Sequence, residues 1–174
     1  FFSTPRLANP ILPFISYPYE WCFTQLKQAA LLTLQIQKRA LKHGMTLKDA
    51  SSYNIQFKDN KPIFIDTLSF EVYEEGKPWT PYKQFCQHFL APLALMSHTD
   101  ARLTHLFKSF IDGIPLDLVS LMLPASTRLK PALLIHIHLH ARAQYGASAK
   151  EVKKTPKNIS KFSLLALIDS LETA

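Results

Sequence analysis

The sequence predicts a mainly α domain with a small β-hairpin, an α+β fold. Residues 20–42 place apolar side chains at helical spacing, with Lys and Gln between them. Residues 54–57 and 62–66 are short runs of β-forming side chains, and the turn-forming sequence KDNK lies between them. The later segments again have helical spacing, so the hairpin is expected to be a small insert in a helical chain.

The helix over 20–42 has a clear end signal. Lys38, Arg39 and Lys42 lie in its last turns, where the helix dipole favours cations. Gly44 then supplies a residue that readily adopts the left-handed conformation of a helix cap. The hairpin at about 54–66 comes soon after this stop.

A second helix is predicted over 80–96. Thr80 is a suitable capping residue, and Pro81 suits the first helical position. Pro92 lies inside the helix, where we expect it to produce a kink. The face predicted to be buried consists of Tyr82, Phe85, Phe89 and Leu93.

The remaining helices are each bounded by capping or helix-breaking residues. Thr99 is expected to cap the first of them, and Ser160 to begin the last. The predicted ranges are 99 to about 113, 115–123, 129–145 with a stop at Gly146, and 160–171.

The predicted domain organisation has four parts. Residues 1–19 contain four prolines and form an extended lead-in, and residues 20–145 form the helical domain with the hairpin. Residues 146–159 form a basic loop, and 160–174 form a C-terminal helix that leads to a downstream domain. The chain begins at Phe1 and not at Met, which suggests a piece of a longer polypeptide.

Composition excludes several classes of site. The chain holds only four glycines, at separate positions, so it carries neither a G-x-G-x-x-G loop nor a Walker A loop. The net charge of +7 comes partly from the polar stretch AKEVKKTPKNISK, which a solvated loop explains better than a nucleic-acid surface. The most apolar stretch, AALLTLQI, is too short to span a bilayer.

The two cysteines, Cys22 and Cys86, are not part of a C-x-x-C pair. Each lies in an apolar helical context, so both are expected to be buried free thiols. This favours a reducing, cytoplasmic location.

Asp49, Asn54 and Asp66 are the residues with the clearest chemical potential. In phosphoryl transfer, one carboxylate positions the acceptor hydroxyl and other oxygen ligands hold magnesium on the phosphates. Asp49 would be the base, and Asn54 and Asp66, at the same end of the hairpin, would be the metal ligands. The structural alternative is that Asp49 caps a turn, Asn54 initiates a strand and Asp66 binds backbone at a strand end.

The order of these elements resembles the C-lobe of the protein-kinase and aminoglycoside-phosphotransferase fold. The long helix stops at Gly44, Asp49 comes five residues later, and Lys48 stands where kinases carry a basic residue. Leu47 departs from the His of that pattern, and Thr67 begins the sequence that replaces Phe-Gly after Asp66. The resemblance implies a kinase C-lobe-like helical domain and ATP with Mg as cofactors.

The motifs SYPYEWCFTQLKQAALLTLQIQ, LKDASSYNIQF, FIDTLSFE, PWTPYKQFC and FIDGIPLDL extend over most of the chain. They resemble a bacterial family of class I S-adenosylmethionine-dependent methyltransferases that includes nodulation proteins. This resemblance implies that this chain precedes the methyltransferase domain, which would bind S-adenosylmethionine and act on a substrate that the sequence does not identify. The chain would then be an accessory module that arranges substrate or partner.

His136, His138 and His140 lie in the segment LLIHIHLHARAQ. On a helix only His136 and His140 share a face, so a packed or hydrogen-bonded role is favoured over a metal site. The aromatic sequence at 17–21, with Tyr17 and Trp21 at its ends, is expected to anchor the lead-in, and ligand stacking is the alternative.

Overall fold

Helix α1, Phe23–Lys42, is the longest element of the fold. The computed structural model describes residues 12–143 and 159–174. The Gln25 side chain accepts a hydrogen bond from the Cys22 backbone N–H at 3.1 Å, which satisfies one donor at the start of the helix. Gly44 follows the helix with φ of +70°, the left-handed conformation predicted for it.

The predicted hairpin is present as β2, Ile55–Lys58, paired antiparallel with β3, Lys61–Phe64. Asp59 and Asn60 join the strands with φ of 51° and 60°. Positive φ at both central residues is typical of a type I′ turn, whose twist matches that of the strands.

A second two-stranded sheet was not predicted. In it, β1, Met45–Leu47, pairs antiparallel with β4, Phe70–Val72, so the two strands enclose the hairpin in the sequence. Each strand has only three residues, which is too short for an alternating pattern to be recognised. This pairing nevertheless brings residues 48 and 69 together, as the Lys48 N–H donates to the Ser69 carbonyl at 2.9 Å.

The second helix consists of three segments that continue one another: α2, Tyr82–Phe85, the π-helical η3, Cys86–Leu90, and α3, Ala91–His98. Pro92 cannot donate to the carbonyl one turn earlier, and the wider π-helical turns lie directly before α3. A kink was predicted at Pro92, and the helix is irregular there because the π-helical segment η3 directly precedes α3. The predicted helix start at Thr80 and Pro81 was wrong, because both lie in a turn in which the Tyr82 N–H donates to the Trp79 carbonyl.

The predicted cap at Thr99 was also wrong. Asp100 caps the next helix, and its carboxylate accepts from the Arg102 N–H at 2.8 Å. Thr99 instead donates to the Met122 carbonyl. The helix is a 3₁₀ helix, η4, over Ala101–Lys108, and so ends several residues before Gly113.

The remaining helices follow the predicted order. Helix α4 spans Leu116–Met122, and a 3₁₀ turn, η5, spans Ala125–Leu129. The next helix begins with α5, Pro131–Leu133, continues as the π-helical η6, Leu134–Leu139, and extends to residue 143. The predicted stop at Gly146 and most of the basic loop lie outside the described residues.

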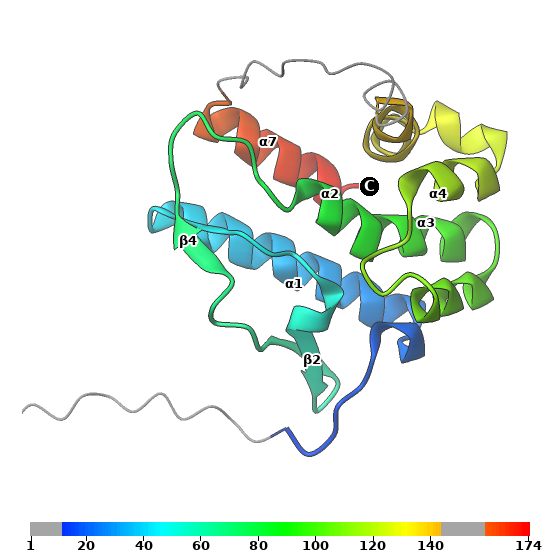
Figure 1. The fold of residues 1–174 in the computed structure, drawn as a ribbon, viewed down its shortest axis with the longest axis horizontal. Coiled ribbons are helices and arrows are strands. Elements are labelled where there is room, and N and C mark those ends of the chain that lie inside the picture. The colour runs from blue at the N-terminus through cyan, green and yellow to red at the C-terminus, as the bar shows by residue number, and fades with distance from the viewer. Residues whose placement is uncertain (1–11, 144–158) are drawn as a thin grey trace, which may run out of the picture.

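Helix α7, Lys161–Glu172, begins where it was predicted, because the Ser160 hydroxyl accepts from the Ser163 N–H at 3.2 Å. It lies beside α1 (Figure 1). Lys38 of α1 joins the two helices through ion pairs of 2.6 Å to Asp169 and 2.7 Å to Glu172.

The lead-in is attached to the hairpin over its described part. The Gln56 side chain exchanges two 3.0 Å hydrogen bonds with the Ser16 backbone. The buried Trp21 indole packs edge-on against Phe57 and donates to the Ser16 hydroxyl at 2.8 Å. These contacts give the aromatic sequence the anchoring role that was expected of it.

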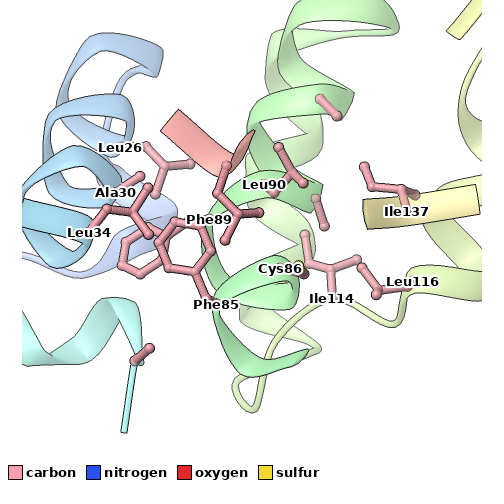
Figure 2. Close-up of a cluster of buried hydrophobic side chains, with 14 of the residues drawn as sticks. Leu26, Ala30, Leu34, Phe85, Cys86, Phe89, Leu90, Ile114, Leu116 and Ile137 are labelled. Carbon is pink, nitrogen blue, oxygen red and sulfur yellow. The ribbon is translucent and has the colours of Figure 1, made fainter. Parts of the chain in front are cut away.

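The hydrophobic core lies where α1 meets the second helix and the segment around Ile114 (Figure 2). Phe85 and Phe89, one helical turn apart, have ring centroids 5.1 Å apart and are almost fully buried. Leu26 and Leu34 of α1 lie on one side of the rings, and Ile137 closes the opposite end of the cluster. In the described residues, no helix combines the length and apolar content needed to cross a membrane.

Replacing Phe89 with Ala should lower the free energy of unfolding by about 3–5 kcal/mol, because the ring is fully buried and leaves a cavity. Phe162→Ala is the matched control, since that ring is 81% exposed and its loss should change stability by about 0.5 kcal/mol or less. Urea denaturation measures both. Equal losses in the two variants would contradict this location of the core.

The cysteines differ, although both were expected to be buried. Cys86 is fully buried, and burial raises the pKa of its thiol to about 12, whereas Cys22 is exposed at the start of α1. Iodoacetamide should therefore alkylate Cys22 in the native protein and Cys86 only after unfolding, as peptide mass spectrometry would show. Native alkylation of Cys86 at the rate of Cys22 would exclude this arrangement.

Candidate functional site

Asn54 and Asp66 lie at the open end of the hairpin, as the sequence predicted. Ile55 pairs with Phe64, and the Ile65 N–H donates to the Asn54 carbonyl at 2.9 Å, so the two strands remain adjacent just outside the ladder. Asn54 ends a short 3₁₀ turn, η2, Ser52–Asn54, and its side chain is buried.

Ser69, which the sequence analysis did not single out, joins the two side chains. The Asn54 amide donates to the Ser69 hydroxyl at 3.3 Å, and that hydroxyl donates to Asp66 Oδ2 at 2.5 Å. Asp66 Oδ1 accepts from the Leu68 N–H at 2.9 Å. Ser69 is only 1% exposed, so the hydroxyl that links Asn54 to Asp66 is buried beneath the end of the hairpin.

Asp49 has a separate local role. Its carboxylate accepts from the Ser51 N–H at 2.9 Å, which forms an Asx-type turn between β1 and η2. Among the described residues, no hydrogen bond connects Asp49 with Asn54 or Asp66. The structure thus brings together the two predicted metal ligands and leaves the predicted base outside their network.

The chemistry available at this end of the hairpin is limited by these bonds. Both Asp66 oxygens already accept hydrogen bonds, and the Asn54 amide nitrogen is used on Ser69. A magnesium ion at Asp66 would have to share a carboxylate oxygen with the Ser69 hydroxyl or the Leu68 N–H, or displace one of them, and Asn54 would bind it through the amide oxygen. Within the described ranges, no group of three or more His, Cys, Asp or Glu side chains is arranged to hold a metal ion.

A buried histidine lies behind the Asp49 turn. His88 of η3 is 2% exposed, and its Nδ1 lies 3.1 Å from the Ser52 hydroxyl and 3.4 Å from the Ser52 N–H. Since the backbone N–H can only donate, Nδ1 accepts and the proton is on Nε2, which hydrogen-bonds the Asp112 carbonyl. Burial lowers the pKa of His88 to about 4, so the ring is neutral near pH 7.

Gly113 makes this contact possible. A Cβ at this position would lie 2.7 Å from the Gln87 Cβ and 3.0 Å from the His88 ring, and φ is +101°. The Ile114 N–H then donates to the Gln87 carbonyl at 3.1 Å. Gly113 has no side chain, and for this reason the chain after η4 can lie directly against the helix beside His88.

The three histidines of the helix that includes η6 are packed against, or hydrogen-bonded to, side chains of other segments. His136 lies 2.8 Å from the Tyr82 hydroxyl and 2.9 Å from the Ser170 hydroxyl, whereas His138 bonds Ser120 and Thr127. His140 stacks on the Tyr82 ring at 5.2 Å, which confirms that His136 and His140 share a face. Burial lowers the pKa of both His136 and His138.

Comparison with known proteins found a curated relative. The chain is 43% identical over 141 residues to Nodulation protein NoeA of Rhizobium meliloti (strain 1021), a match that covers 79% of this chain. The match spans only 29% of the relative's length. No protein-family model and no solved structure matches the chain, so its likeness to a kinase C-lobe stays a prediction.

The buried His88 predicts a pH dependence of stability. Its folded-state pKa of about 4 lies below the ordinary value of 6.5, so the unfolded chain binds the proton more readily. The contribution of His88 to the free energy of unfolding is therefore constant above about pH 6.5. As the pH falls from about 6.5 toward 4, the free energy of unfolding decreases by about 1.4 kcal/mol for each pH unit.

Urea denaturation of the wild type and of His88→Gln, at several values of pH between about 7.5 and 4.5, measures this effect. The other titrating groups are common to the two proteins, so the difference between their slopes isolates His88. Parallel curves would show that His88 is not held neutral by the fold.

Proposed function

We propose that this chain is an accessory module of a protein of the S-adenosylmethionine-dependent methyltransferase family, and that it arranges substrate or partner for a catalytic domain elsewhere in the polypeptide. The observation that carries the proposal is that this chain is 43% identical to a part of the relative that makes up only 29% of its length. The network at the end of the hairpin is consistent with it. Asp66 accepts from Ser69 and Leu68, and Asn54 is buried against Ser69. These residues join β3 to β4, which is a structural task.

The comparison supports a role within a larger protein. The matched region makes up 29% of the nodulation protein, so most of that relative lies outside the part that this chain resembles. We extend its role in nodulation to this chain as part of the proposal. The sequence motifs that resemble this family are the basis for proposing a methyltransferase-family protein.

The cofactor is proposed to bind outside this chain. A class I methyltransferase holds S-adenosylmethionine at a glycine-rich turn, and Gly44, Gly76, Gly113 and Gly146 are each isolated in the sequence. Gly44 and Gly113 have positions in helix ends and loop contacts that explain them without a ligand. The partner of this module would accordingly be the methyltransferase domain.

The second candidate is an ATP- and magnesium-dependent phosphotransferase lobe with Asp49 as base and Asn54 and Asp66 as metal ligands. One observation favours it: the Ser69 hydroxyl brings Asn54 and Asp66 into one network at the same end of the hairpin. The position of Asp49 in a separate turn weakens this candidate.

Calorimetric titration of S-adenosylmethionine and of MgATP into the intact polypeptide separates the two proposals. The accessory role predicts that S-adenosylmethionine binds, that MgATP does not, and that Asp66→Asn and Asp49→Asn leave S-adenosylmethionine affinity unchanged within about twofold. The substitutions can lower stability, since Asp66 would lose an acceptor for Ser69 or Leu68.

Two results would contradict this account. MgATP binding that Asp66→Asn removes and Asp49→Asn retains would establish the nucleotide site in place of the accessory role. Absence of S-adenosylmethionine binding by the intact polypeptide would remove the methyltransferase assignment. Thermal unfolding of each variant, without ligand, controls for loss of fold.

A further inference from the structure

A cleft of about 540 Å³ lies between α4, η5 and the helix that includes η6. The η6 segment packs against both α4 and η5 at the same corner of the molecule (Figure 1). Its polar lining consists of Asp117, Ser120, Arg128, His138 and Arg142. None of the residues discussed for methyl or phosphoryl transfer belongs to this lining, so a ligand of the cleft is independent of the proposed function.

His138 fixes the walls of the cleft relative to one another. The side chain is 7% exposed, with Nδ1 at 2.8 Å from the Ser120 hydroxyl of α4 and Nε2 at 2.9 Å from the Thr127 hydroxyl of η5. One ring therefore joins three segments of the chain. A cleft whose walls are held in this way does not need to be ordered by its ligand.

The protons in this network can be assigned. Thr127 donates its own proton to the Pro124 carbonyl at 2.6 Å, so it must accept from His138 Nε2. His138 Nδ1 is then an acceptor, and the Ser120 hydroxyl donates to it. The Ser120 hydroxyl proton is therefore not available to a ligand. The positively charged groups of the described lining are the guanidinium groups of Arg128 and Arg142.

The fold directs both arginines to this cleft. Arg128 directly follows Thr127, whose hydroxyl is bonded to His138. Arg142 lies four residues after His138 on the same helix and therefore on the same face. Burial is the main cause of the lowered pKa of His138, and the charge of Arg128 contributes to it, which is consistent with a guanidinium close to the ring.

The cleft is cationic and apolar at once. Asp117 is the one carboxylate in its described lining, so with His138 neutral the two arginines give it a net charge of +1. Leu121 of α4 is 80% exposed and Leu139 of η6 is 49% exposed, and both line it. Guanidinium groups suit carboxylate and phosphate, and exposed leucines suit a hydrocarbon body.

We infer that this cleft binds a small amphipathic anion, in which a carboxylate or phosphate is attached to an apolar body. The anionic group contacts Arg128 and Arg142, and the apolar body covers Leu121 and Leu139. Carboxylate and phosphate both accept hydrogen bonds from guanidinium groups, and the titration below distinguishes them.

The test is calorimetric titration of the intact polypeptide with octanoate, octyl phosphate, octanol and acetate, each below the concentration at which it forms micelles. Octanoate or octyl phosphate should bind at least about tenfold more tightly than octanol, which lacks the charge, and than acetate, which lacks the chain. The tighter of the two anions identifies the preferred headgroup.

Three variants locate the binding. Arg128→Gln and Arg142→Gln should each weaken the anion about fivefold or more, with little effect on octanol. Arg39→Gln, at an arginine on α1 outside the cleft, is the matched control and should bind as the wild type does. Unfolding curves of all three show whether the fold is retained.

A second readout distinguishes a ligand site from a merely structural cluster. A bound anion offsets the positive charge of Arg128, so the pKa of His138, followed by NMR, should rise when octanoate is added. Equal affinity for octanol and octanoate, wild-type affinity in both arginine variants, or no detectable binding of either anion would each overturn the inference.

Discussion

The structure depends on three buried imidazoles, each of which joins segments that are distant in the sequence. His88 connects the Ser52 turn with the Asp112 carbonyl, His136 connects Tyr82 with Ser170, and His138 connects Ser120 with Thr127. A neutral imidazole can donate from one nitrogen and accept at the other, so a single side chain satisfies two buried partners. Burial lowers the pKa of all three rings. Burial in the helical packing therefore disfavours the charged form of each ring.

A similar use of one polar side chain for several contacts explains the end of the hairpin. Ser69 accepts from Asn54 and donates to Asp66, while its carbonyl accepts from Lys48. One buried serine directly before β4 thus connects the residues that follow β1 and β3 with Asn54, directly before β2. Residues that would be metal ligands in a phosphotransferase are here used to hold short strands together.

Local sequence patterns were sufficient for much of the fold. The helix α1, its stop at Gly44, the hairpin turn at Asp59 and the cap at Ser160 each follow from residues within one or two turns of the chain. The β1–β4 pairing and the Ser52–His88 contact could not be predicted, because each depends on residues that only the tertiary fold brings together. The caps at Thr99 and Thr80 failed for a related reason: the neighbouring residues Asp100 and Pro81 take the cap positions of the two helices.

The site could be predicted only in part. Asn54 and Asp66 were placed correctly at one end of the hairpin because strand pairing follows from the turn. Ser69 lies in the motif FIDTLSFE but was not recognised as a partner of Asp66, and Arg128 lies outside the quoted motifs. Their roles come from the hydroxyls and rings that the fold places beside them. The claim that buried, uncharged histidines hold the fold together is tested most directly at His88. The measurement is long-range ¹H–¹⁵N NMR of the His88 ring between about pH 7.5 and pH 5. The account predicts a neutral ring with its proton on Nε2 throughout this range, and protonation of His88 near the ordinary histidine pKa would contradict it.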